Sequence, residues 1–190
     1  YLTGFSAGGT AAQELVKEHA DLFAALVTGG SSIGALEEEQ IEVIKESGIP
    51  VVTYSGLCDY NCPMLLYRDG RGGKEKNTSV TKCAGFSSWA EALGIDASLT
   101  SEEAMDIHEN SEDEVKAMFG IDFDETEKIT HNDTDYYIGR FYDENGVNRL
   151  TYLGVENCPH WSAGYTAQII WDSISQYSRD TQTGEMKIAE

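Results

Sequence analysis

The chain has 190 residues, enough for one domain with a substantial core, and its 33 acidic against 13 basic side chains give a formal charge of −20. So acidic a surface repels phosphate groups and anionic lipid headgroups, which argues against nucleic acid and against a membrane as partners. With 41% hydrophobic residues the chain is too apolar for disorder. We therefore expect a single domain over residues 1–190, without a run of the roughly 18 apolar residues that span a bilayer.

The first third of the chain alternates between strand and helix patterns. Its apolar runs predict strands over 1–3, 24–28 and 49–54, and its amphipathic segments predict helices over 7–20 and 37–47. The strands are apolar throughout, as expected when helices cover both faces of a parallel sheet. The fold class that we expect is therefore α/β, with a mostly parallel sheet flanked by helices.

Residues 64–133 have a different character. A polar, glycine-rich loop over 68–74 precedes helical patterns at 87–94, 98–109 and 111–119. Ser111 and Glu114 have the spacing of a capping box, and Gly120 is placed to end that last helix. We interpret 64–133 as a helical, lid-like insertion within the domain.

The last third of the chain predicts a hairpin and a helix. Two β-rich runs, 136–142 and 149–155, flank Asn145-Gly146, a strong hairpin signal. The following segment, 165–177, predicts an amphipathic helix with Ile169, Ile170, Ile174 and Tyr177 facing inward. Residues 178–190 are polar, and we expect a frayed tail.

The strongest chemical signal is Gly4-Phe5-Ser6-Ala7-Gly8, a G-x-S-x-G between a predicted strand and a predicted helix. A nucleophile elbow has this context: the serine lies on a strained turn, and glycines avoid clashes there. The positive N-terminal end of the helix favours negative charge developing beside it. The structural alternative is a glycine-rich turn with a serine that only caps the helix.

A nucleophilic serine needs a base, and the base needs an orienting carboxylate. Asp59 follows a predicted buried strand, where parallel sheets place ligand chemistry, although it could also only cap a turn. Of the four histidines, His160 follows the last predicted strand and precedes the last helix. The alternative for His160 is a partly buried structural residue beside Trp161. The order Ser6, Asp59, His160 is the order of a hydrolase triad.

These motifs together resemble an α/β-hydrolase, in particular the esterases related to polyhydroxybutyrate depolymerases and feruloyl esterases. Members of that group commonly carry H-G-x-x-D-x-x-V-P around the acid, whereas residues 55–63 read S-G-L-C-D-Y-N-C-P. The resemblance covers residues 1–63 and about 136–178. It implies a serine esterase that forms an acyl-enzyme and needs no cofactor, with Ser6 as nucleophile, His160 as base and Asp59 as its orienting acid.

The resemblance also implies an oxyanion hole with the Ala7 backbone N–H as one donor. Phe5 and Trp161 are expected to line the substrate pocket, and the expected substrate is a small-molecule or carbohydrate-linked ester. The strands that precede the elbow strand in this fold have no counterpart here. We therefore expect an N-terminal half of the same protein, or a second chain, to complete the sheet. A serine peptidase of the prolyl-oligopeptidase type and an inactive hydrolase-fold binding module stay open as alternatives.

The four cysteines do not have the spacing of a zinc site, and we expect no metal. Cys58 and Cys158 each precede a proposed triad residue, so they are expected to lie close together. A disulfide between them is expected if the protein is exported, and two thiols if it is not.

Overall fold

The computed structural model describes residues 1–59, 66–68, 76–78 and 80–189. Most of the predicted glycine-rich loop, residues 69–74, and the Cys62-Pro63 end of the Asp59 motif lie outside the described residues. The elements in chain order are β1 (Leu2–Phe5), α1 (Ala7–His19), the 3-10 turn η1 (Ala20–Leu22), β2 (Leu26–Gly29), α2 (Glu38–Ser47), β3 (Val51–Gly56), β4 (Leu66–Arg68), β5 (Lys76–Thr78), α3 (Val80–Ala92), α4 (Ser101–Asn110), α5 (Glu114–Phe119), β6 (Glu125–His131), β7 (Thr134–Tyr142), β8 (Asn148–Val155), α6 (Thr166–Ile174), β9 (Tyr177–Arg179) and β10 (Met186–Ile188).

Six strands form the main sheet, in the order β1-β2-β3-β8-β7-β6. The first four strands run parallel to one another, and β7 and β6 are added antiparallel. This confirms the expected α/β class with a mostly parallel sheet. Two further two-stranded sheets pair β4 with β5 and β9 with β10.

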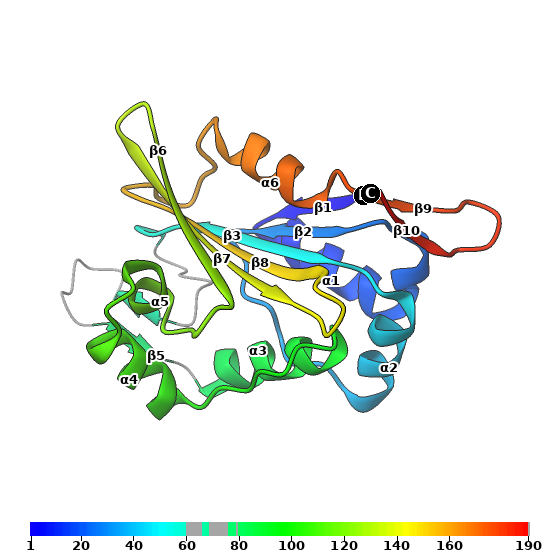
Figure 1. The fold of residues 1–190 in the computed structure, drawn as a ribbon, viewed down its shortest axis with the longest axis horizontal. Coiled ribbons are helices and arrows are strands. Elements are labelled where there is room, and N and C mark those ends of the chain that lie inside the picture. The colour runs from blue at the N-terminus through cyan, green and yellow to red at the C-terminus, as the bar shows by residue number, and fades with distance from the viewer. Residues whose placement is uncertain (60–65, 69–75, 79, 190) are drawn as a thin grey trace.

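Helices cover the sheet on both faces, and the side chains of each strand alternate between them (Figure 1). Leu26 and Val51 belong to a core that also contains residues of α1, α2, α3 and α5. Their chain neighbours Val27 and Val52 belong to a second core, under α6. Burial on both faces explains why these strands are apolar without a period-2 pattern.

The predicted hairpin is confirmed as β7 and β8, with Gly146 at φ 74° in the turn. The capping box predicted at Ser111 is wrong, because Asp113 caps α5 instead. Its carboxylate accepts the N–H groups of Val115 and Lys116 at 2.8 and 3.0 Å. Asp113 stands immediately before the first helical residue, where a short acceptor reaches the free N–H groups best.

The frayed tail predicted for 178–190 is also wrong, since β9 and β10 pair as a hairpin. The Arg179 guanidinium holds this hairpin to the body of the domain. It donates to the carbonyl oxygens of Ala20, Phe23 and Ser47 at 2.8–3.3 Å. These three carbonyls lie at the ends of other elements, and each gains a charged hydrogen-bond donor. The polar composition of residues 178–190 does not reveal these contacts.

The segment interpreted as a lid, 64–133, contributes to the main body where it is described. Trp89 and Phe86 of α3 are buried in the same core as α1 and α2. Residues 125–131 form β6 at the edge of the main sheet, paired with β7 over seven positions. The segment 64–133 therefore supplies part of one helical layer and one strand of the main sheet, and its role as a lid stays a prediction.

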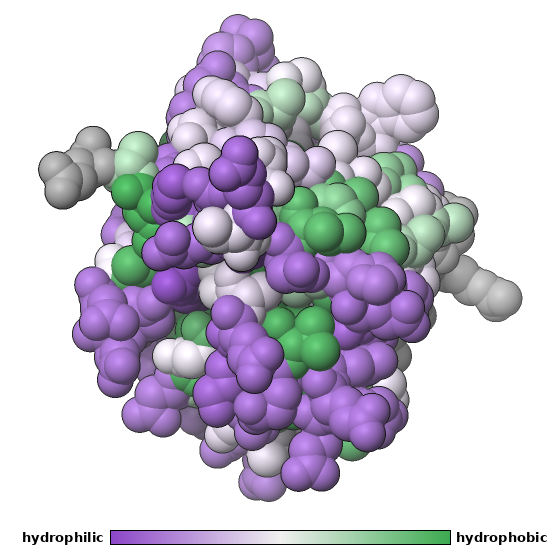
Figure 2. Space-filling model, turned by 90° about the vertical axis from the view of Figure 1, so that its right-hand side faces the viewer, coloured by the Kyte–Doolittle hydropathy of each residue, from purple (hydrophilic) through white to green (hydrophobic). Residues whose placement is uncertain are grey.

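The surface of the domain combines hydrophilic and hydrophobic areas. Hydrophilic residues dominate the lower half of the face shown in Figure 2, and separate hydrophobic patches lie between hydrophilic areas. No helix in the described part of the chain is both long and apolar enough to cross a membrane.

Candidate active site

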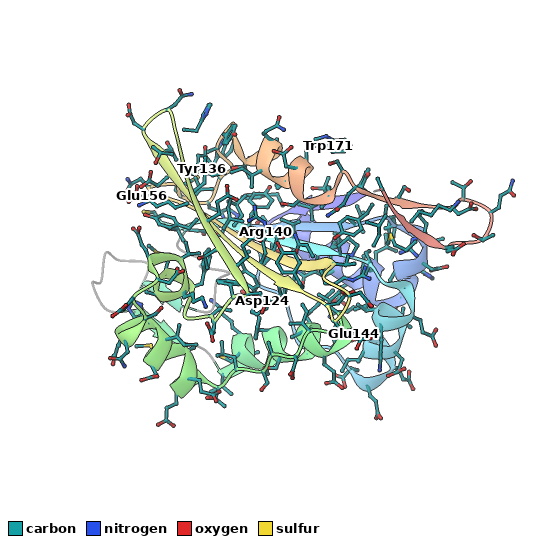
Figure 3. All side chains as sticks on the ribbon, viewed as in Figure 1. Asp124, Tyr136, Arg140, Glu144, Glu156 and Trp171 are labelled. Atoms are coloured by element: carbon teal, nitrogen blue, oxygen red, sulfur yellow. The ribbon has the colours of Figure 1, made fainter. Side chains whose placement is uncertain are left out.

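The parallel strands β1, β2, β3 and β8 end at one edge of the sheet, on the left in Figure 1. Figure 3 marks this edge by Tyr136, near the start of the antiparallel β7, and by Glu156, directly after β8. Residues that follow these strands in sequence, 6, 59 and 160, are therefore brought to the same region from distant parts of the chain.

Ser6 lies between β1 and α1 in a backbone conformation that is rare for a residue with a side chain, φ 56° and ψ −124°. Its N–H donates to the Gly29 carbonyl at 2.7 Å, which fixes the turn to β2. Its hydroxyl makes no capping hydrogen bond to α1. The alternative that Ser6 is an ordinary helix cap is therefore wrong.

Gly4 allows this sharp turn, because a Cβ there would lie 2.1 Å from the Gly8 carbonyl oxygen. A Cβ on Gly8, by contrast, would have no other atom within 4 Å. The expectation that crowding requires the motif glycines therefore holds for Gly4 and not for Gly8. The next residue, Gly9, is crowded as well, with the Ser31 hydroxyl 2.4 Å from its Cβ position.

His160 lies on the loop between β8 and α6, and its Nε2 is 2.8 Å from the Ser6 Oγ. This loop passes directly over the end of β3. A Cβ on Gly56 would lie 2.1 Å from the Cys158 carbonyl oxygen and 2.3 Å from that of Pro159. The loop is also held by the Cys58 N–H, which donates to the Cys158 carbonyl at 2.9 Å. The glycine in the S-G-L-C-D motif thus permits the approach of the histidine loop.

Asp59 is buried, with 4% of its surface exposed, and its Oδ2 lies 2.7 Å from the His160 Nδ1. A carboxylate only accepts hydrogen bonds, so the proton of this bond belongs to Nδ1. With that proton on Nδ1, the lone pair of an uncharged imidazole is at Nε2, where it can accept the Ser6 O–H. The structure thus joins the three sequence-predicted residues into one hydrogen-bonded line from a buried carboxylate to a half-buried hydroxyl.

The other three histidines lie elsewhere in the fold. His19 is exposed at the end of α1. His108 Nδ1 lies 2.7 Å from the Ala117 carbonyl, and the His131 ring stacks on Tyr165 with centroids 4.1 Å apart. Choosing His160 by its place after the last strand of the sheet is thus consistent with the geometry.

The remaining residues of the sequence prediction surround Ser6 and His160. Ala7 is the first residue of α1, so its N–H has no acceptor within the helix. Trp161 is 70% exposed beside His160. Phe5 is half-buried, and its ring centroid lies 4.9 Å from that of His160.

Cys58 and Cys158 are near each other, as expected, and both are free thiols. Burial raises the pKa of the Cys158 thiol, and the neighbouring Cys58 and Asp59 raise it further. Cys158 therefore stays protonated at neutral pH and is not a competing nucleophile. Among the described residues no group of three or more His, Cys, Asp or Glu side chains is arranged to hold a metal ion.

Gly30 is a site residue that the sequence pattern does not identify. Its φ is 58°, and a Cβ there would lie 2.8 Å from the Phe5 ring and 3.0 Å from the His160 Cε1. The only signal in the sequence is the Gly29-Gly30 pair after a predicted strand, which by itself indicates no more than the end of that strand.

No protein-family model matches this chain, and a search of curated proteins finds no sequence relative.

Proposed function

We propose that the protein is a serine hydrolase that cleaves carboxylic esters, built on an α/β-hydrolase architecture. The observation that carries this proposal is the line Asp59–His160–Ser6, with bonds of 2.7 and 2.8 Å and the hydroxyl on a strained turn. A serine with these partners has a base to accept its proton and a carboxylate to stabilise the resulting imidazolium. An ordinary structural serine needs neither.

In the proposed reaction the Ser6 Oγ attacks the ester carbonyl carbon while His160 Nε2 takes its proton. The carbonyl oxygen becomes an oxyanion beside the N-terminal end of α1, where the Ala7 N–H supports it. Collapse breaks the bond to the alcohol oxygen, which receives the proton from His160. Water then attacks the acyl-Ser6 by the same route, and this releases the acid and restores the serine. The cycle needs no cofactor.

The substrate class of the proposal is a small-molecule or carbohydrate-linked ester. Trp161 supports it, since an exposed aromatic ring next to the base can contact a planar or sugar ring.

We also propose that a further polypeptide segment, from the same protein or a second chain, pairs with the edge of β1. The N–H groups of Leu2 and Ser6 donate to Ala25 and Gly29 of the β2 side. Backbone groups alternate along a strand, so those of Thr3 and Phe5 face away from β2. Beside this edge lies an apolar groove of about 500 Å³ between the sheet and α6. Its half-exposed rings, Tyr1 and Trp171, lie 5.7 Å apart. An added strand would form hydrogen bonds with the backbone groups of Thr3 and Phe5 at this edge, and its apolar side chains would fill the groove.

The esterase is tested by labelling the natural protein with a fluorophosphonate, followed by mass spectrometry. We expect label on Ser6, none in Ser6→Ala, and wild-type labelling in Ser162→Ala, an exposed serine two residues after His160. Ester hydrolysis by Ser6→Ala at the wild-type rate, or turnover of peptides but not of esters, would refute the proposed esterase activity.

Hydrogen exchange tests the added strand separately: the Thr3 and Phe5 amides should exchange fast in the 190-residue chain and slowly in the natural protein.

A further inference from the structure

Phe5 occupies the position between the first glycine and the serine of the G-x-S-x-G motif, and its side chain packs toward the core under α6. Its ring touches two other rings. The centroid distance is 4.9 Å to His160 and 6.0 Å to Tyr54 of β3. Phe5 therefore lies between the catalytic-site histidine and the body of the sheet.

The neighbours of Phe5 leave its ring little freedom. A Cβ on Gly30 would approach the far end of the Phe5 ring to 2.8 Å, so the Gly30 backbone lies against that ring edge. Tyr54, on the other side, packs its own ring onto Gly29, where a Cβ would lie 2.2 Å from the Tyr54 Cζ. The absence of side chains at Gly29 and Gly30 thus makes room for a closely packed row of rings, Tyr54, Phe5 and His160.

The two hydrogen bonds of His160 do not by themselves fix the plane of its ring. Bonds at Nδ1 and Nε2 hold one line through the imidazole, and the Cβ–Cγ bond ties the ring to the loop, so a tilt about that line requires the loop or the side-chain torsions of His160 to shift. A tilt moves the Nε2 lone pair out of the direction of the Ser6 proton. A contact against the ring opposes this shift, and Phe5 supplies such a contact, with ring centroids 4.9 Å apart.

We propose that Phe5 is a positioning residue that holds the plane of the His160 ring, with the Gly30 backbone packed against both rings. This inference rests on the proposed function. Its consequence differs from that of a residue lining the substrate pocket. Loss of Phe5 should slow the chemical step by the same factor for every ester, because the base is misaligned whatever acyl group is bound.

The test compares Phe5→Leu with wild type on p-nitrophenyl acetate and p-nitrophenyl hexanoate. A displaced base costs on the order of 10- to 100-fold in rate. We expect kcat to fall by one such factor, the same for both esters, while KM stays within about twofold. Phe141→Leu is the matched control, since Phe141 is a buried ring that packs on Phe86 and Phe123 in the opposite core. It should lower stability and leave kcat unchanged.

A second readout does not depend on turnover. We expect the proton of the His160 Nδ1–H···Asp59 bond to give a far-downfield NMR resonance that shifts or broadens in Phe5→Leu and stays unchanged in Phe141→Leu. If Phe5→Leu does not fold, the more conservative Phe5→Met takes its place, with the same expected results. If wild type hydrolyses no ester, the proposed function fails while the resonance still tests the positioning role. An unchanged resonance, or a loss confined to KM or to the longer ester, would refute that role.

Discussion

The two glycines of the G-x-S-x-G motif offer a matched pair of substitutions with opposite expected results. Gly4→Ala places a Cβ 2.1 Å from the Gly8 carbonyl oxygen and 2.4 Å from the Gly8 carbonyl carbon. Gly8→Ala places a Cβ in open space at the second position of α1. Both changes add one methyl group within the same five residues, so a general sensitivity of this turn would affect both variants equally.

The distances set the expected size of each effect. Ordinary contact begins at 3.4 Å, so Gly4→Ala requires the start of α1 to move by about 1.3 Å relative to β1. Ser6 lies between those two elements, and a displacement of about 1 Å costs roughly 100-fold in rate, or about 2.7 kcal/mol in the activation free energy. Overpacking adds about 1–3 kcal/mol of lost stability. Gly8→Ala should instead stabilise the protein by about 0.5–1 kcal/mol, because alanine is the better helix former.

The assay measures the rate of fluorophosphonate labelling at Ser6 together with the urea midpoint of each variant. We expect Gly4→Ala to label at least 10-fold more slowly and to unfold at lower urea. Gly8→Ala should label at the wild-type rate with an equal or higher midpoint. Equal labelling rates for Gly4→Ala and wild type would contradict the argument that close backbone approach at Gly4 sets the position of Ser6.

Two further substitutions test the acid and the hairpin. Asp59→Asn should lower kcat/KM for an ester by roughly 10⁴-fold with little change in KM. The reason is that the new amide can donate to Nδ1 and favour the wrong tautomer of His160. A loss of less than about tenfold would argue against Asp59 as the orienting acid. Asp143 accepts from Val147, Asn145 and Arg149 in the β7–β8 turn. Burial alone would raise its pKa, but these donors outweigh burial and hold the pKa below its usual value. The stability it provides is thus complete above the unfolded pKa of about 3.9 and is lost as pH falls through the lowered value. Urea midpoints of wild type and Asp143→Asn should differ at pH 7 and converge at acid pH; a constant difference would contradict this assignment.

The part of the fold with strong local signals was predictable from the chain. The strands near 1–3, 24–28 and 49–54 are apolar runs bounded by glycine or proline, and β1, β2 and β3 are found there. The α/β class follows from their alternation with amphipathic helices. The cap of α5 and the hairpin β9–β10 escape prediction because their decisive partners are not visible in a local pattern: Asp113 competes with Ser111, and Arg179 reaches carbonyls more than a hundred residues away.

The sequence by itself determined which side chains were candidates for the site, because Ser6, Asp59 and His160 each follow a predicted strand and stand in the order of a triad. Only the tertiary structure decided that they meet, with His160 hydrogen-bonded to residues 101 and 154 positions away. It also decided that Gly4 and Gly56 are needed for close approach whereas Gly8 is not, and that the ring of Phe5 lies against His160. The physical reason is that a motif fixes residue types along one segment, while distances between segments depend on how the sheet stacks its strands and on which backbones touch.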